Sequence, residues 1–340
     1  MALTLRTEDI TEAVAELRVS DHRLRIGGPP ASHPFTNEWC FFFKPSITSA
    51  AAGVGFQNAV DLALDLFDRH GMAIIEAHAL GPGYMRTHSL ASWHYRELVE
   101  VAMRASTVAD ATLEIHPDIC ADRVLGGYEA LTELGLDGQE LDRLWYASEH
   151  SRLGRSAIGA LVSVRRERIL LVNGFIPGQV RSYSATGTVT VVLRIASDEC
   201  WSIARNQLLG AANPADAVPG SFRHELWSRR EQIGLPEVDV QRNGAHLSAG
   251  PLEALYELQQ LTSVDYPRLR PLSDFSFGRR LLASSVLQRE LDVLVPRHAP
   301  AEKVESMPYR YVRAREAVEN QDEPQALARL ESLMHIGASL

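Results

Sequence analysis

The sequence predicts a mixed α+β protein, and three features lead to that expectation. Hydrophobic residues make up 45% of the 340-residue chain and charged residues 23%, which is typical of a globular protein with a buried core. Short runs rich in β-branched and aromatic residues are separated by longer segments with apolar residues at helical spacing. The sequence contains no internal repeat and no low-complexity tract, so it accommodates one large domain or two ordinary ones.

The first part of the chain contains five expected segments. Residues 7–19 carry apolar side chains at helical spacing, and the glycine- and proline-rich residues 27–34 are typical of a linker. Residues 39–43 form an apolar and aromatic run that a nearby proline stops, which predicts a buried strand. Residues 55–69 follow a helical pattern that ends next to a glycine, and residues 72–78 predict the next strand.

The second part of the chain completes a recognisable order of elements. Strands are expected at 169–172 and at 188–195, which reads Thr-Val-Thr-Val-Val-Leu-Arg-Ile. Helices are expected at 199–209, 251–262, 276–294 and 323–334. The order is strand, helix, strand, a long interruption, strand, helix, short strand and helix. It predicts a ferredoxin-like split βαβ sheet with its helices on one face, a fold that by itself leaves the function open.

Charge and cysteine usage limit the classes of function. The formal net charge of -9, with no long block of like charges, gives no support to a protein that binds duplex nucleic acid. Cys40, Cys120 and Cys200 are far apart and form no CxxC pair, which argues against a disulfide framework or a structural zinc site. The N-terminus lacks a signal-peptide pattern, and no apolar run approaches the roughly 20 residues that cross a bilayer. We therefore expect a cytoplasmic protein without a membrane span.

The most specific motif lies between residues 210 and 257. Residues 213–216 read Asn-Pro-Ala-Asp, residues 219–223 contain Pro-Gly followed by Arg223, and residues 243–248 read Asn-Gly-Ala-His-Leu-Ser. This series resembles the pattern of the nucleoside diphosphate kinase family, in which an NPAD-x-x-PG-x-x-R loop precedes an N-x-x-H-x-S strand. The resemblance implies that the split sheet is that of a nucleoside diphosphate kinase-like core.

Further segments resemble the same family and set the expected domain boundaries. The segments that resemble the family are 43–45, 67–72, 94–95, 175–178 and 187–189. The resemblance implies a core made of residues 37–97 and 172–262. It leaves residues 1–36 as an N-terminal helix and linker, residues 98–171 as a mixed insertion, and residues 263–340 as a helical C-terminal extension.

Phosphoryl transfer without a ternary complex requires a nucleophile that is phosphorylated and then releases the group. Imidazole is suitable because it is nucleophilic when neutral and leaves readily when phosphorylated. The resemblance assigns this role to His246 and the role of orienting its ring to Glu257. It also implies that Tyr95 helps to position phosphate near the nucleophile. Lys44 and Arg223 are expected to balance the charge of the transferring group, where positioned cations supply much of the catalysis.

The resemblance also implies a nucleotide site. Its expected residues are Lys44, Phe175, Arg205, Asn206, Arg223 and Asn243. Phe175 is expected to stack on the base, although a phenylalanine at this position also has an ordinary core interpretation. ATP or another nucleoside triphosphate is the expected substrate, and Mg²⁺ is expected to arrive with its phosphates, so no protein metal site is expected. The expected partners are a nucleotide, a small-molecule acceptor and a second copy of the chain in a homodimer.

Four positions depart from the family pattern. Ser46 stands where the family has an aspartate, Ala212 where it has a threonine, and Ala249 where it has an acidic residue. The arginine expected before the NPAD loop falls on Asn206, with Arg205 as the neighbouring candidate. These changes predict a phosphotransferase with an altered acceptor in a specialised pathway. The alternative is a non-catalytic nucleotide-binding or regulatory module on the same fold.

Overall fold

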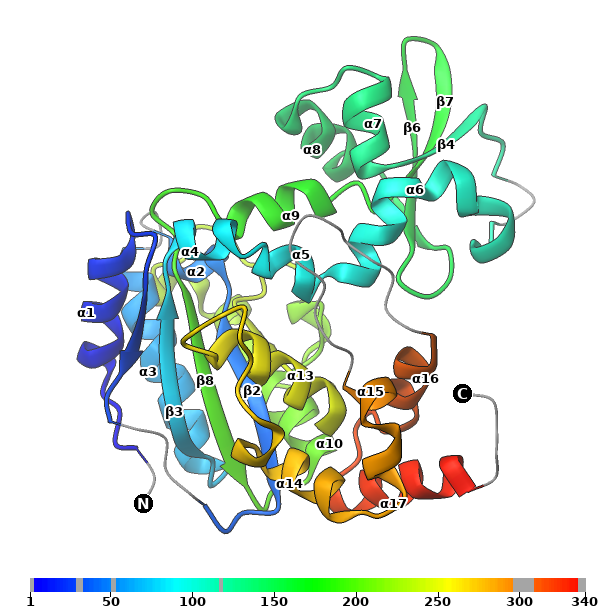
Figure 1. Cartoon of the computed structure of the whole chain (residues 1–340). Coiled ribbons are helices and arrows are strands. Elements are labelled where there is room, and N and C mark those ends of the chain that lie inside the picture. Colours follow the sequence, from blue (N-terminus) through cyan, green and yellow to red (C-terminus); the bar gives the residue numbers. More distant parts are fainter. Residues whose placement is uncertain (1–2, 29–32, 50–52, 116–118, 296–308, 336–340) are drawn as a thin grey trace. The chain divides into compact units, whose positions relative to one another are not determined.

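The computed structural model describes residues 3–28, 33–49, 53–115, 119–295 and 309–335. The chain divides into two compact units (Figure 1). The first unit comprises Met1–Leu90, Tyr183–Pro300 and Pro308–Leu340, and the second comprises Ala91–Ser182 and Ala301–Met307. Along the described ranges, no helix is both long enough and apolar enough to span a membrane.

The first unit is built on a five-stranded antiparallel sheet in the order β1-β3-β8-β2-β9. Its strands are β1 (Arg23–Ile26), β2 (Asn37–Phe43), β3 (Ala73–Leu80), β8 (Thr190–Ser197) and β9 (Ala245–Leu247). The last four strands in the spatial order, β3-β8-β2-β9, have the arrangement of a ferredoxin-like split βαβ sheet. The predicted α+β fold class is therefore confirmed.

The N-terminal segment differs from the expected helix and linker. Helix α1 (Thr7–Leu17) forms as predicted, but the chain then adds strand β1 to the sheet. Arg23 pairs with Leu80 and Ile26 with Ala77, so this strand lies at the edge of the sheet beside β3. The strand has only four residues, two of them arginines, and its hydrogen bonds to β3 rather than its own propensity stabilise it. Part of the predicted linker, residues 29–32, lies outside the described residues.

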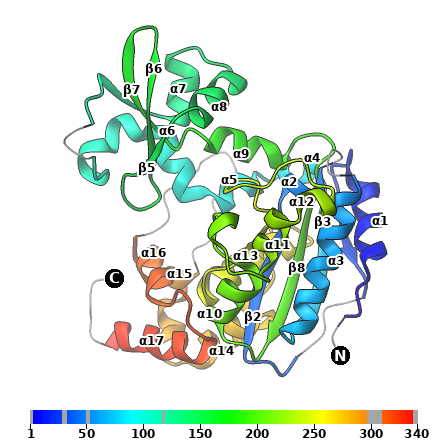
Figure 2. The same ribbon diagram turned by 180° about the vertical axis from the view of Figure 1, so that it is seen from behind.

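One face of the sheet carries the main hydrophobic core. Alternate residues of β2, namely Trp39, Phe41 and Phe43, are fully buried on this face because successive strand side chains point to opposite sides. Helix α3 (Val54–Arg69) packs its apolar stripe on the same core. The other elements that cover this face include α1, α10 (Trp201–Ile203), the π-helix η2 (Ala204–Leu209) and α11 (Phe222–Ser228) (Figure 2).

Helices also cover the second face, which corrects the expectation of helices on one face only. Helix α13 (Pro251–Thr262) follows β9 and folds back over β2, and α14 (Ser276–Ala283) also packs there (Figure 1). Nearly every side chain of α13 is buried. The physical reason is that β2 and β8 bear buried side chains on both faces, and a sheet of this kind requires a layer on each side.

Beneath this second layer lies a network of buried charges. Arg194 Nε donates to Glu38 Oε1 at 2.7 Å, and its Nη1 lies 3.7 Å from Glu76 Oε2. Arg270 Nη1 donates to the same Glu76 oxygen at 2.7 Å, and the backbone N–H of Ser276 donates to Glu38 Oε2 at 3.1 Å. Because Arg270 and Ser276 belong to the C-terminal extension, these bonds attach that extension to the central strands.

The C-terminal extension is more interrupted than predicted. The single helix expected at 276–294 is broken into α14, the 3₁₀ turn η5 (Leu287–Glu290) and α15 (Leu291–Leu294). Helices α16 (Tyr309–Ala317) and α17 (Glu323–His335) follow. The remaining short elements of the first unit are α2 (Pro45–Thr48), α4 (Pro82–Thr87), η3 (Pro214–Asp216), α12 (Arg230–Ile233) and η4 (Leu272–Asp274), and α5 (Leu90–His94) begins at the boundary with the second unit.

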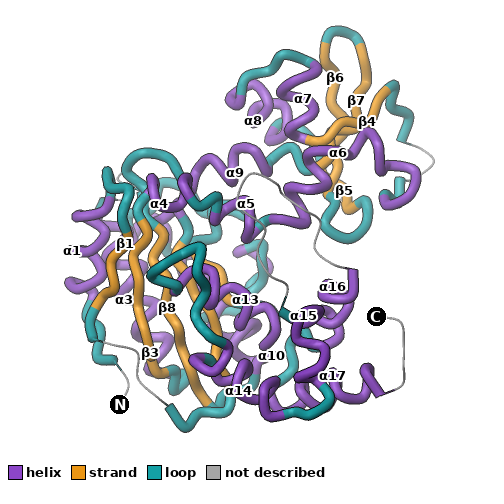
Figure 3. Tube along the Cα trace, in the orientation of Figure 1, coloured by secondary structure: helices purple, strands orange, loops and turns teal. Residues whose placement is uncertain are grey.

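The second unit has a sheet of its own, in the order β4-β7-β6-β5 (Figure 3). Its strands are β4 (Arg123–Gly126), β5 (His150–Arg152), β6 (Ile158–Val164) and β7 (Glu167–Val172), and its helices are α6 (Arg96–Thr112), α7 (Gly127–Glu133) and α8 (Gly138–Tyr146). Helix α9 (Ile176–Tyr183) leads back to the first unit. Trp145 lies in the centre of this unit's core, only 1% exposed.

We expect Glu38→Gln to lower the free energy of unfolding by about 3 kcal/mol, because Arg194 would keep its buried charge and lose its nearest carboxylate. Urea unfolding at neutral pH measures this loss. The matched control is Glu290→Gln, which breaks the more exposed pair with Arg310 at 3.2 Å and should cost much less. Equal losses in the two variants would contradict the importance of the buried network.

Candidate functional site

Lys44, Asn243 and the NPAD loop are connected by hydrogen bonds at one end of the central strands. Lys44 follows β2 directly, and its backbone N–H donates to Gly244 O at 2.8 Å. Its Nζ donates to Asn243 Oδ1 at 2.8 Å. Asn243 Nδ2 donates in turn to Ala212 O at 2.9 Å and to Val240 O at 3.0 Å. The amide of Asn243 therefore fixes the position of the Lys44 ammonium group relative to the loop.

Arg223 provides a second fixed cation. It lies in α11 and is 8% exposed, and it donates from Nη1 to Gly210 O at 3.0 Å and from Nη2 to Ala245 O at 2.9 Å. These bonds join the residues before the NPAD loop to strand β9. Gly244 permits the approach, since its φ is +82° and a Cβ would lie 2.3 Å from a methyl carbon of Leu226.

The environment of Lys44 changes its acidity. Burial, together with the smaller effect of the nearby positive charge of Arg223, lowers the pKa of Lys44 from 10.5 to about 7. A lysine of this kind is poised between its two protonation states near neutral pH. An anion placed between Lys44 and Arg223 would favour the charged ammonium, so the two cations form a site that is electrostatically suited to phosphate.

His246 lies in the middle of β9, opposite Phe42 of β2. The rings of His246 and Phe42 are stacked, with their centroids 4.6 Å apart and an interplanar angle of 21°. Nε2 of His246 lies 2.8 Å from Oε1 of Glu257, which α13 brings over this face of the sheet. The histidine side chain is 17% exposed and the glutamate side chain 5%. The ring is thus held by a stacked phenylalanine and a buried carboxylate.

The contact with Glu257 favours one tautomer of the imidazole. A carboxylate beside Nε2 stabilises the form with the proton on Nε2, and in a neutral ring the lone pair then lies on Nδ1. A neutral imidazole with a positioned Nδ1 lone pair is a nucleophile. The carboxylate also stabilises the positive charge that develops on the ring when Nδ1 forms a bond.

The NPAD loop acts as a scaffold for these groups. Asn213 Nδ2 donates to Asp216 Oδ2 at 2.8 Å, which closes the short turn η3. Ser221 Oγ donates to Val218 O at 2.6 Å just before α11 begins. These hydrogen bonds within the loop hold its backbone in place. The carbonyl oxygens just before the loop are then available to Asn243, which binds Ala212 O, and to Arg223, which binds Gly210 O.

Arg205 and Asn206 occupy other surroundings. Arg205 Nη1 donates to Glu319 Oε1 at 2.9 Å and to Asn320 Oδ1 at 3.3 Å, so its guanidinium is bound to the C-terminal extension. Asn206 is exposed in the π-helix η2. The structure therefore brings Lys44, Arg223 and Asn243 together. The His246–Glu257 pair is separate from them, although His246 follows Asn243 closely in the chain. Arg205 is bound elsewhere.

Tyr95 and Phe175 belong to the second unit. The Tyr95 ring meets that of His94 edge-on at 4.6 Å, and Tyr95 packs with the cluster around Ile176. The Phe175 ring lies 5.5 Å from that of Trp145 at an angle of 39°. Phe175 is therefore half-buried against the core of its own unit, which is the ordinary core arrangement noted from the sequence.

One residue of the site was not nominated from the sequence. Phe42 contributes the ring that stacks on His246. The alternation of side chains along a strand could have indicated which face Phe42 occupies. Phe42 is two residues before Lys44, and in an extended chain such residues point to the same side. Only the register that pairs Phe42 with His246 shows that this phenylalanine contacts the histidine.

The fold and these contacts describe an α+β protein with a histidine–carboxylate pair and a cationic cluster. No family model matches the chain, and no curated protein matches it. The solved structure of an NDP kinase from Pyrobaculum aerophilum is similar to it over 66% of this chain and 94% of that chain, with 17% sequence identity and a TM-score of 0.34. Likeness at this level does not establish a family, so the function must follow from the contacts of the site itself.

Lys44 should titrate with a midpoint near 7 rather than near 10.5. Between these values the unfolded chain binds more protons than the folded one, so the contribution of Lys44 to the free energy of unfolding rises with pH across this window. Lysine labelled with ¹³C gives two signals, because the chain contains only Lys44 and Lys303. Lys44→Arg removes one signal and assigns it, and an assigned midpoint near 10 would show that the site does not depress the Lys44 pKa.

Proposed function

We propose that this chain is a nucleotide-dependent phosphotransferase that carries the γ-phosphoryl group of a nucleoside triphosphate on His246. The observation that supports this proposal most directly is the contact of 2.8 Å between Nε2 of His246 and the buried carboxylate of Glu257. A buried carboxylate that holds one imidazole nitrogen is costly unless it has a partner, and here its partner is a partly exposed ring with a second nitrogen suited to attack.

The proposed first step forms one bond and breaks one. The Nδ1 lone pair of His246 attacks the γ-phosphorus, the bond to the bridging oxygen breaks, and the nucleoside diphosphate leaves with that electron pair. In the second step a deprotonated oxygen of the acceptor attacks the same phosphorus, and the electron pair of the N–P bond returns to Nδ1. Glu257 is a positioning residue in both steps, because it holds the ring and offsets the positive charge on it.

Lys44 and Arg223 are the proposed phosphate ligands. Asn243 holds Lys44, and two backbone carbonyls hold Arg223, so both cations are placed before the nucleotide arrives. Preorganised charges of this kind stabilise the charge that spreads over the transferring group without reorganisation during the reaction. Mg²⁺ would be supplied with the nucleotide phosphates and would offset their negative charge.

The acceptor is proposed to differ from an ordinary nucleoside diphosphate. Ala212 lacks a hydroxyl, Asn206 lacks a charge, and Arg205 is held by Glu319 of the C-terminal extension. Losing a charged hydrogen bond to phosphate weakens binding by about tenfold or more. A second nucleotide would therefore bind less tightly, which favours a small acceptor that needs fewer phosphate ligands.

His246→Ala should abolish phosphorylation of the protein by γ-³²P-labelled ATP with Mg²⁺. The unaltered protein should carry a label that is stable to base and labile to acid, because a phosphorus–nitrogen bond hydrolyses when the ring is protonated. The matched control is His224→Ala, which removes another histidine that lies beside a glutamate, 3.4 Å from Glu225. Labelling that persists in His246→Ala would contradict the proposal.

Glu257→Gln tests the positioning role separately. It keeps the shape of the side chain but removes the charge, so the rate of labelling should fall by about a hundredfold while the affinity for ATP stays the same. Rapid-quench labelling at saturating ATP gives the rate, and equilibrium dialysis gives the affinity. An unchanged rate would show that Glu257 has only a structural role.

The second candidate is a nucleotide-binding module without catalysis, favoured by the engagement of Arg205 with the C-terminal extension. ATP binding by an unlabelled protein, with affinity lost in Lys44→Ala and kept in His246→Ala, would establish this alternative.

A further inference from the structure

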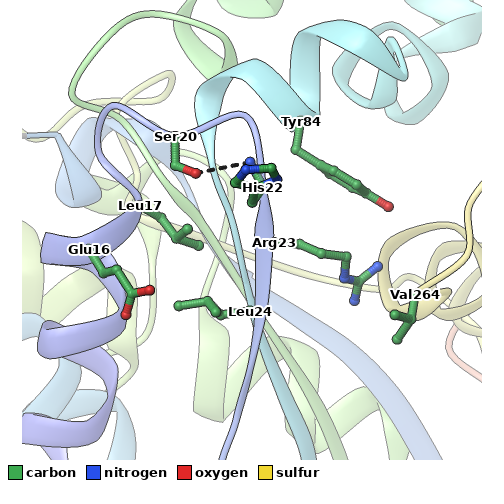
Figure 4. Close-up of a pocket in the computed structure, with 8 residues that line it drawn as sticks. All are labelled: Glu16, Leu17, Ser20, His22, Arg23, Leu24, Tyr84 and Val264. Carbon is green, nitrogen blue, oxygen red and sulfur yellow. Dashed lines mark hydrogen bonds between the residues drawn. The ribbon is translucent and has the colours of Figure 1, made fainter.

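A pocket of about 520 Å³ lies in the first unit where α1, β1, α4 and the chain after α13 meet (Figure 4). Three of these four elements lie outside residues 37–97 and 172–262, the core that the family resemblance implies. Figure 4 shows Arg23 and Tyr84 extending to one side of β1, toward Val264, with Glu16 and Leu24 on the other side. The pocket is thus a product of the parts that this chain adds to its core.

Arg23 has a fixed position and no direct negative partner in this pocket. Its Nη1 donates to Ser263 O at 2.5 Å, and its Nη2 lies 2.6 Å from His78 Nδ1. Within the described parts of the chain, no ion pair joins Arg23 to a carboxylate. Burial lowers the pKa of Arg23, and the Tyr84 hydroxyl and the more distant charge of Glu76 offset part of that shift.

His78 orients the guanidinium of Arg23 without placing a charge beside it. Burial lowers the pKa of His78 to about 4, so its imidazole is neutral at pH 7. Nε2 of His78 lies 2.8 Å from Glu76 Oε1 and can only donate to it, which leaves Nδ1 as the acceptor for Arg23. A half-buried guanidinium with two neutral partners is a charge that an anion would stabilise.

Tyr84 supplies a second, independent feature of a ligand site. The side chain is 8% exposed, and its buried hydroxyl makes no hydrogen bond of normal geometry with any described residue. The Arg23 guanidinium lies over the Tyr84 ring, 5.6 Å from the centroid. A buried hydroxyl is usually paired, so this one marks the place of an acceptor from outside the chain.

We propose that this pocket binds a small organic carboxylate, with its charged end between Arg23 and the Tyr84 hydroxyl and its apolar part against Val264. One guanidinium and one hydroxyl match the single charge and two oxygens of a carboxylate. The ligand is not the phosphoryl acceptor, because β1 and β9 are the two edges of the sheet, about 19 Å apart at the usual strand spacing.

The test uses ¹⁹F NMR titration of the full chain with 4-fluorobenzoate, and with 4-fluorobenzamide and 4-fluorophenyl phosphate as the neutral and doubly charged comparisons. The carboxylate should bind in the millimolar range or tighter, and both comparisons should bind at least about tenfold more weakly. Equal binding of the amide, or no binding of 4-fluorobenzoate at millimolar concentration, overturns the proposal. The readout is independent of phosphorylation, so it succeeds or fails separately from the proposed function.

Tyr84→Phe is the decisive variant, because it removes only the hydroxyl. Since that hydroxyl has no good partner in the chain, the unfolding midpoint should not fall, while affinity for 4-fluorobenzoate should fall about tenfold. Arg23→Gln should weaken binding by at least as much. The controls are Tyr311→Phe, a buried tyrosine elsewhere in the unit, and Arg86→Gln, an exposed arginine in the same helix as Tyr84. Unchanged affinity in Tyr84→Phe places the ligand elsewhere and overturns the site.

Discussion

The pairing of β9 with β2 is the interaction on which the candidate site depends. Strand β9 has only three residues, and it pairs in a register that sets His246 opposite Phe42 and Ala245 opposite Phe43. A slip by one residue would turn His246 toward the hydrophobic core on the other face. Ser248 continues the pairing, since its backbone N–H donates to Cys40 O at 3.0 Å and its Oγ accepts from Cys40 N–H at 3.0 Å. The pairing therefore fixes the position of His246, the proposed nucleophile, by backbone geometry before any side-chain contact is made.

Several other parts of the first unit reinforce that register. Arg223 holds the carbonyl of Ala245 at the start of β9, and the indole N–H of Trp201 donates to Ser248 O at 3.1 Å beyond its end. Between these two points, α13 places the carboxylate of Glu257 beside Nε2 of His246. Each of these contacts comes from a different helix. The position of the His246 imidazole therefore depends on the packing of helices on both faces of the sheet.

The buried charges on the second face have a different role. Glu38, Glu76, Arg194 and Arg270 replace what would ordinarily be an apolar contact between the sheet and the residues after α13. Ion pairs of this kind rarely add stability over a well-packed apolar core, but each partner requires the others once it is buried. The network thus specifies where the C-terminal extension docks. The same docking places Ser263 next to Arg23 and Glu319 next to Arg205.

The sequence by itself determined the main strands, the helix at 55–69, the α+β class and the motif residues Lys44, Arg223, Asn243 and His246, because strand runs, helical spacing and short motifs are local. It did not determine strand β1, whose four residues pair with β3 in the sheet, or the second helical layer, which follows from the burial of both sheet faces. It also could not show that Arg205 binds Glu319, because that contact joins residues 114 positions apart. Tertiary structure alone decided which side chains meet, since the contacts of Phe42 with His246 and of Arg23 with Tyr84 depend on strand register and on helix placement rather than on neighbours in the chain.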